Sequence, residues 1–236
     1  MDAVVIGAGP AGLAAAAELQ KAGYTVTVVD RADSVGSSWS KHYDRLHLHT
    51  SRPLSSLPGR PIPARYGRWV ARDDFRAYLA DYATAEKLDV RLGVTASGIR
   101  KTDTGWTVDT SIGALPADAV VVATGYNHTA KIPDWPGLDS YTGRVLHSSE
   151  YRNPTELGAK DVLVVGPGNS GAEIAADLAG EGVDVRIAGR PPAILVRRQV
   201  LGIPTQSLTL STYPLPTKAA DKVARVMQIL TVGDLS

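Results

Sequence analysis

The chain contains two short apolar runs, at 2–6 and 161–165, and each is followed by a glycine-rich turn and then by an alanine-rich stretch. A continuous apolar run of this length predicts a buried parallel strand, and apolar positions spaced three and four apart predict a helix. We therefore expect helices over 11–21 and 170–179, each followed by a second strand, over 24–29 and 183–188. The two regions thus share one order of strand, turn, helix and strand.

Both glycine-rich turns have the spacing of a dinucleotide-binding loop. The first is Gly7-Ala8-Gly9-Pro10-Ala11-Gly12, and the second is Gly166-Pro167-Gly168-Asn169-Ser170-Gly171. In such a loop the first glycine permits the tight turn, the second admits a pyrophosphate, and the third lets the helix pack against the strand. The phosphates then lie at the helix N-terminus. Two such units predict an α/β fold with two Rossmann-like dinucleotide-binding domains; a glycine-rich turn without a ligand is the alternative.

The residue after each second strand bears on which dinucleotide binds. Asp30 follows the first loop at about the distance expected for an acid that accepts hydrogen bonds from ribose hydroxyls. In the second unit Arg190 stands there instead, and a cation suits the 2′-phosphate of NADPH rather than NADH. Arg197 and Arg198 are further candidates for that phosphate. Ordinary solvated surface charges are the alternative for all three arginines.

Composition narrows the class of protein. The chain has 25 basic and 24 acidic residues, so its net charge of +1 gives no reason to expect nucleic acid or an anionic membrane as partner. It has no apolar run long enough for a transmembrane helix, and its first strand lacks the basic leader of a signal peptide. Cysteine is absent, which fits a cytoplasmic protein and excludes a disulfide reductase, since that reaction needs a redox cysteine pair.

The chain between the two units is less regular. Segment 33–42 is a Gly/Ser-rich turn that carries Trp39, and the prolines of 43–68 favour an irregular path. Apolar spacing predicts the remaining elements, which are a helix over 73–86, meander strands over 90–99 and 106–109, a buried strand over 119–123, and an amphipathic helix over 217–231.

Four features resemble the class B flavin-containing monooxygenases, a family that includes the YUCCA-like enzymes and the Baeyer–Villiger monooxygenases. They are the first glycine loop with its later turn Gly36-Ser37-Ser38-Trp39, the strand end Ala123-Thr124-Gly125-Tyr126, the signature at 141–151, and the second glycine loop. The signature, Tyr-Thr-Gly-Arg-Val-Leu-His-Ser-Ser-Glu-Tyr, closely follows the family's aromatic-x-Gly-x-x-x-His-Ser/Thr-x-x-Tyr/Trp pattern. It is the specific feature, because two glycine loops alone fit any flavoprotein with two dinucleotides.

The resemblance implies FAD in the first unit and NADPH in the second. The residues implied for FAD are Gly7, Gly9, Pro10, Ala11, Gly12, Asp30, Arg31, Ser38, Trp39, His49, Val94, Ala123, Thr124 and Gly125. Those implied for NADPH are Gly166, Gly168, Asn169, Ser170, Gly171 and Arg190, with His147 and Ser148 at the hinge between the domains. A purely structural histidine is the alternative for His147. His49 stands where many members carry an asparagine over the flavin, and we assign no catalytic residue and no metal ligand.

The implied activity is FAD- and NADPH-dependent insertion of one oxygen atom from O2 into a small organic substrate, an amine, sulfide or ketone, through a C4a-hydroperoxyflavin. An NADPH oxidase or flavin reductase without oxygen insertion and a non-catalytic dinucleotide-binding fragment are the alternatives. Members of this family are usually longer and complete the flavin domain after the NADPH domain. We therefore expect a truncated fold, with an incomplete FAD domain over 1–152 and an NADPH domain over 153–236. Its exposed apolar surface would weaken flavin binding or require another chain, for example in a homo-oligomer.

Overall fold

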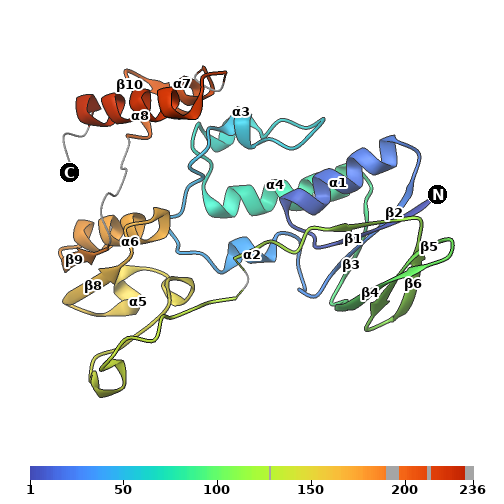
Figure 1. Ribbon diagram of the computed structural model, residues 1–236, viewed down its shortest axis with the longest axis horizontal. Helices are drawn as coiled ribbons and strands as arrows, with labels where there is room; N and C mark the ends of the chain where they lie inside the picture. Colours follow the sequence, from blue (N-terminus) through green and yellow to red (C-terminus); the bar gives the residue numbers. More distant parts are fainter. Residues whose placement is uncertain (128, 190–196, 212–213, 232–236) are drawn as a thin grey trace.

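The computed structural model describes residues 1–127, 129–189, 197–211 and 214–231. Two α/β units lie beside each other, with the short helix α2 (Ser37–Ser40) between them, and the two C-terminal helices lie above the second unit (Figure 1). None of the described helices is long and apolar enough to cross a membrane.

The N-terminal unit is built on a four-stranded parallel sheet. Its strands lie in the order β3-β2-β1-β7, with bounds β1 Asp2–Ile6, β2 Thr25–Asp30, β3 Asp89–Leu92 and β7 Ala119–Val122. Helices α1 (Pro10–Lys21) and α4 (Arg72–Ala85) pack on one face. The other face is covered by an antiparallel meander of β4 (Ala96–Thr102), β5 (Gly105–Thr110) and β6 (Gly113–Ala117).

The alternation of side chains along β1 explains these layers, because successive residues of a strand point to opposite faces. Ala3 and Val5 pack in the cluster that contains Leu13 of α1, whereas Val4 packs with Val108 of the meander. The sheet is therefore covered on both faces, as parallel sheets generally are.

The second unit has the same local order but fewer strands. Strands β8 (Asp161–Val165) and β9 (Asp184–Ala188) are parallel, and α6 (Asn169–Gly180) connects them. After it come the hairpin β10 (Gln199–Val200) and β11 (Ile203–Pro204) and the helices α7 (Thr205–Ser211) and α8 (Thr217–Thr231). The connecting segments form short helical turns, which are α3 Arg52–Ser55, η1 Ala64–Tyr66, η2 Leu138–Ser140, η3 Ser148–Glu150 and α5 Pro154–Leu157.

A third hydrophobic cluster joins the two units. Tyr43 and Leu46 come from the segment after α2, Tyr151 from the end of the 141–151 signature, and Ile174 and Leu178 from α6. All five side chains are buried. Residues far apart in the chain thus share one core at the junction between the units.

The expected α/β fold with a parallel sheet is confirmed, and one strand prediction is wrong. A single meander strand was expected over 90–99, but the chain turns at Gly93, which has φ of 69°. Residues 89–92 therefore join the parallel sheet as β3, and the meander begins only at Ala96. Residues 33–68 also contain short helical turns where we expected irregular chain.

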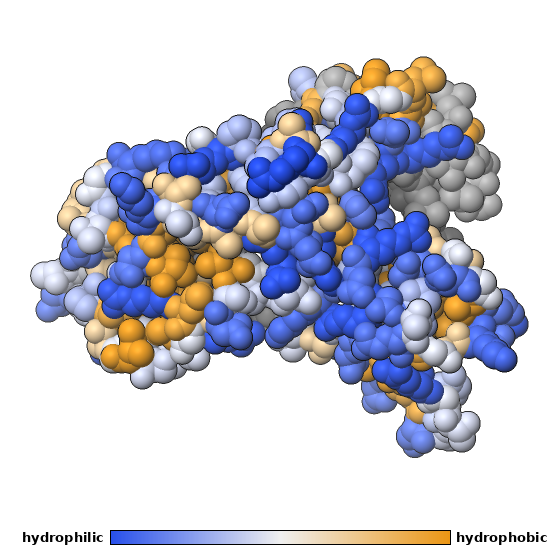
Figure 2. All heavy atoms as spheres, turned by 180° about the vertical axis from the view of Figure 1, so that it is seen from behind, coloured by the Kyte–Doolittle hydropathy of each residue, from blue (hydrophilic) through white to orange (hydrophobic). Residues whose placement is uncertain are grey.

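Some apolar side chains on the strands are exposed. Val122 of β7, Leu163 and Val165 of β8 and Ile187 of β9 are between 51% and 61% exposed. Figure 2 shows apolar surface gathered over the N-terminal unit and over the C-terminal helices. Among the described residues, β7 pairs with β1 alone and β8 with β9 alone.

Candidate cofactor-binding site

The first glycine loop is fixed by the ends of the neighbouring strands. The Gly7 N–H donates to the Val29 carbonyl at 2.8 Å, and Gly7 has φ of 113°, which favours glycine. A Cβ at Gly7 would overlap the Ala123 carbonyl oxygen and lie 2.9 Å from its carbon. The sequence Ala123-Thr124-Gly125 at the end of β7 is therefore brought against the loop.

The other two glycines leave an open cradle at the start of α1. A Cβ at Gly12 would overlap the Gly7 carbonyl oxygen, so the third glycine lets helix and loop pack closely. A Cβ at Gly9 would meet none of the described residues within 4 Å. Helix α1 begins at Pro10, and no side chain in the described part of the chain caps it. Backbone N–H groups of the first turn that no side chain satisfies are suited to a phosphate.

Asp30 is bonded to this loop. Its Oδ2 accepts from the Ala8 N–H at 2.7 Å, and its Oδ1 accepts from the Ala32 N–H at 2.9 Å. The Val94 N–H donates to the Asp30 carbonyl at 2.8 Å, so these two predicted residues lie together. Each carboxylate oxygen has a second lone pair, and ribose hydroxyls can still donate to it.

The turn that carries Trp39 is tied to the same loop. The Gly36 N–H donates to the Ala8 carbonyl at 3.0 Å, and Gly36 has φ of 65°. The Trp39 ring meets Phe75 of α4 edge to face, with centroids 4.8 Å apart. Ser38 and Arg31 are exposed. The structure therefore gathers most residues predicted for FAD around one loop.

The second loop repeats the cradle on α6. The Gly166 N–H donates to the Ala188 carbonyl at 2.7 Å, and a Cβ at Gly171 would overlap the Gly166 carbonyl oxygen. Among the residues that the structure describes, a Cβ at Gly168 would meet nothing within 4 Å, and no side chain caps α6. Asn169 and Ser170 are exposed in its first turn. Arg190, predicted for the 2′-phosphate, lies outside the described residues.

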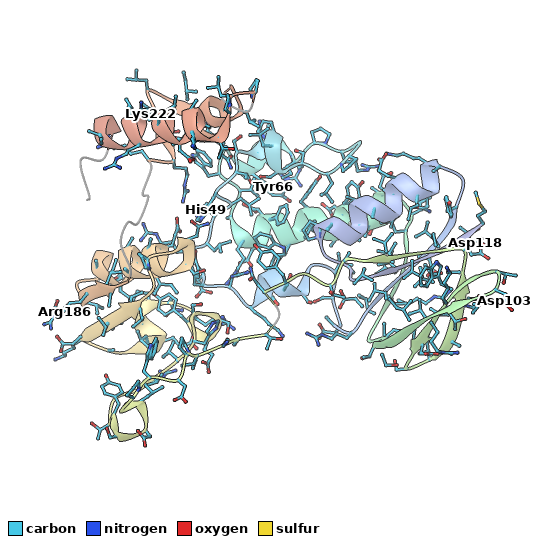
Figure 3. All side chains as sticks on the ribbon, viewed as in Figure 1. His49, Tyr66, Asp103, Asp118, Arg186 and Lys222 are labelled. Carbon is cyan, nitrogen blue, oxygen red and sulfur yellow. The ribbon has the colours of Figure 1, made fainter. Side chains whose placement is uncertain are left out.

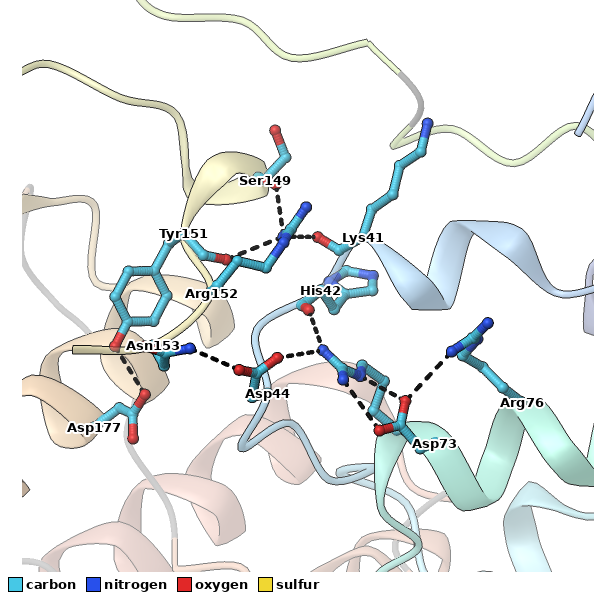
Figure 4. Close-up of polar contacts among 11 residues, drawn as sticks. Lys41, His42, Asp44, Asp73, Arg76, Ser149, Tyr151, Arg152, Asn153 and Asp177 are labelled. Carbon is cyan, nitrogen blue, oxygen red and sulfur yellow. Dashed lines mark hydrogen bonds and ion pairs between the residues drawn. The ribbon is translucent and has the colours of Figure 1, made fainter. Parts of the chain in front are cut away.

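A buried polar contact fixes α6 against the rest of the protein (Figure 4). The Tyr151 hydroxyl donates to Asp177 Oδ2 at 2.8 Å, and Arg45 Nη1 lies 3.5 Å from Asp177 Oδ1. Tyr151 is 3% exposed and Asp177 8%. Burial, with the Asp177 contact, raises the pKa of Tyr151. The neutral phenol therefore serves as a donor at ordinary pH.

Arg72 at the start of α4 organises the polar side of the junction. Its Nη1 donates to the His42 carbonyl at 2.6 Å and to Asp44 Oδ1 at 2.9 Å, and Asn153 Nδ2 donates to Asp44 Oδ2 at 2.7 Å (Figure 4). The hydrogen bonds from Asn153 and Arg72 lower the pKa of Asp44. Burial, together with the nearby charges of Arg152 and Arg72, lowers the pKa of His42.

The side chain of His147 caps the short helix η3. Its Nδ1 accepts from the Ser149 N–H at 3.2 Å, while Glu150 Oε2 accepts from the His147 N–H at 2.8 Å, so that it caps η3. Ser148 is exposed beside it. Contact of either residue with the nicotinamide cofactor stays a prediction.

His49 is placed against helix α6. Its Nε2 lies 3.5 Å from Glu173 Oε1, which also accepts from Arg198 Nη2 at 2.8 Å. The Arg198 guanidinium lies over the ring of Trp69, 5.3 Å from its centroid. Figure 3 shows His49 in the region between the two units. Its contact with a flavin stays a prediction, as does a phosphate role for Arg198, which the structure pairs with Glu173.

The residues that hold the two units together were not predicted from the sequence. Asp177 carried a signal, since it lies next to Leu178 and three residues after Ile174, on the apolar side of the predicted helix. An acid in that position needs a buried partner. Its partner Tyr151 was noted only as the last residue of the signature.

The sequence matches a family model and known proteins. Residues 4–203 match the family model described as pyridine nucleotide-disulphide oxidoreductase. The chain is 39% identical over 237 residues to indole-3-pyruvate monooxygenase YUCCA1 of Oryza sativa subsp. japonica, covering 98% of this chain and 58% of that protein. It therefore spans less than two thirds of that relative's length.

Two solved structures are similar to this chain over most of its length. A flavin-containing monooxygenase from Stenotrophomonas maltophilia matches with a TM-score of 0.79 and 31% identity, over 96% of this chain and 68% of that one. A cyclohexanone monooxygenase mutant from Rhodococcus sp. Phi1, bound to NADP+, matches with a TM-score of 0.70 and 26% identity, over 95% and 43%.

Proposed function

Because the chain belongs to the flavin-containing monooxygenase family of oxidoreductases, we propose that it binds FAD at the first glycine loop and NADPH at the second. The proposed reaction is insertion of one oxygen atom from O2 into a small organic substrate. The observation that carries this proposal is the pair of glycine cradles, at Gly9 and Gly168, each in front of a helix N-terminus that no side chain of the described residues caps.

The residues present fit the two cofactors. Bound FAD would supply hydride acceptance from NADPH and the activation of O2. The chain's part is to hold and orient, with the first turns of α1 and α6 on the two pyrophosphates and Asp30 on the adenosine ribose of FAD. The Tyr151–Asp177 contact keeps α6 in place relative to the N-terminal unit, which supports a fixed approach of one cofactor to the other.

The set of candidate substrates is wider than the one that the resemblance implied. Amines, sulfides and ketones remain candidates. The relative from Oryza sativa is described as an indole-3-pyruvate monooxygenase, so an aromatic 2-oxo acid joins the panel for this chain.

The test has a binding part and a turnover part. Purified protein should carry or take up FAD, identified by chromatography after heat release, and should bind NADPH in preference to NADH. With a productive substrate, NADPH consumption should match oxygenated product. Consumption that yields hydrogen peroxide in equal amount with every substrate would favour an NADPH oxidase. Absence of both flavin and NADPH binding would refute the proposal.

A further inference from the structure

The two units can be compared position by position through one shared hydrogen bond. In the first unit the Gly7 N–H donates to the Val29 carbonyl, and in the second the Gly166 N–H donates to the Ala188 carbonyl. The next residue of each strand end is then Asp30 in the first unit and Gly189 in the second, so the expectation from the sequence that Arg190 takes the place of Asp30 is wrong, and Gly189 takes it. The next residue of each loop is Ala8 in the first and Pro167 in the second.

These two positions touch in both units, but by different chemistry. In the first, the Ala8 N–H donates to the Asp30 carboxylate at 2.7 Å. In the second, Pro167 has no N–H to donate, so no acceptor is needed opposite it. A Cβ at Gly189 would overlap Cδ of Pro167 and lie 2.8 Å from its Cγ. A proline ring is not a flexible chain end and cannot turn away, so Pro167 requires glycine at 189.

We propose that Pro167 and Gly189 form a matched pair that sets cofactor choice in the second unit. The ring of Pro167 keeps every side chain, and in particular an acid, out of position 189. No carboxylate can then bind the 2′-hydroxyl that NADH carries, and none repels the 2′-phosphate of NADPH. This inference rests on the proposed binding of NADPH and adds a determinant that is separate from Arg190.

The test is a cycle of binding measurements by isothermal titration calorimetry, with FAD in excess so that the first site is filled. Gly189→Asp alone should lose affinity for NADPH and NADH alike, because the new side chain displaces the loop. Pro167→Ala alone should keep the preference for NADPH. The double variant Pro167→Ala/Gly189→Asp recreates the Ala8–Asp30 pair. It should regain NADH binding relative to Gly189→Asp, with NADPH weakened about tenfold to a hundredfold relative to wild type.

Two results would overturn the proposal that Pro167 and Gly189 form a matched pair. One is a Gly189→Asp variant that binds NADPH as tightly as wild type. The other is a double variant that binds NADH no better than Gly189→Asp alone. A ligand-free cycle separates this failure from failure of the proposed function. Gly189→Ala should lower the melting temperature and Pro167→Ala should restore it, and that rescue does not depend on any cofactor. A wild-type chain that binds no NADPH but shows the rescue would refute the cofactor role and keep the packing pair.

Discussion

Replacing Tyr151 by phenylalanine tests the junction between the two units with the removal of a single oxygen atom. The hydroxyl donates to the Asp177 carboxylate at 2.8 Å, and both side chains are almost completely buried. The phenylalanine ring would keep the packing against Tyr43 and leave Asp177 with Arg45 at 3.5 Å. Loss of a hydrogen bond to a buried charged group costs about 1.5–3 kcal/mol. We therefore expect the free energy of unfolding to fall by about 2 kcal/mol.

Thermal unfolding followed by circular dichroism measures this change. For a chain of this size each kcal/mol shifts the melting temperature by about 2–4 °C, so the expected shift is about 4–8 °C. Tyr141→Phe is the matched control, because Tyr141 belongs to the same signature but is 61% exposed. Asp177→Asn keeps an acceptor for the hydroxyl, and its effect combined with Tyr151→Phe should be less than additive. A Tyr151→Phe variant as stable as Tyr141→Phe would show that the buried hydroxyl does not hold the junction.

Four further substitutions test the loops and the junction. Gly9→Val should abolish FAD binding while the circular dichroism spectrum is kept, because its Cβ would meet none of the described residues within 4 Å in the free protein but a phosphate in the complex; retained flavin would contradict the assignment. As a contrast, Gly12→Ala should destabilise the fold itself, since its Cβ would overlap the Gly7 carbonyl oxygen. Arg190→Ala should weaken NADPH about tenfold to a hundredfold and leave NADH nearly unchanged, as measured by calorimetry; an equal loss for both cofactors would exclude the 2′-phosphate role. His42 has a pKa below its usual 6.5, so the unfolded chain takes up the proton first as pH falls, and stability should drop from about pH 6.5 downward. Urea denaturation should show a smaller drop for His42→Gln than for wild type.

The glycine loops were predictable because their requirements are local. The turn, the backbone φ of the first glycine and the start of the helix all follow from six neighbouring residues. The strand prediction over 90–99 failed because apolar alternation continues on both sides of Gly93, and sequence alone does not say that the two parts join different sheets. Strand β3 joins the parallel sheet because it pairs with β2, and β4 joins the meander because it pairs with β5.

The junction was hidden for a different reason. Asn153 reaches Asp44 across 109 residues of chain, and Arg72 reaches Asp44 across 28. No periodic pattern links such positions, since each side chain alone looks like an ordinary polar residue of the surface. The exception was Asp177, whose place beside apolar helix positions could have indicated a buried partner. The sequence thus predicted the two cradles but not the contacts that orient one relative to the other.

Because of the hydrophobic cluster at the junction, one unit of this protein cannot be replaced by that of a relative without regard to the other unit. A boundary at residue 152 separates Tyr43 and Leu46 from Ile174 and Leu178, although all four are buried in one core. A chimera that replaces the second unit from residue 153 onward would therefore set foreign side chains against Tyr43, Leu46 and Tyr151. Replacement of the second unit should succeed only when segment 43–46 and the signature are carried along with it, so the unit of recombination is larger than the unit that binds the cofactor.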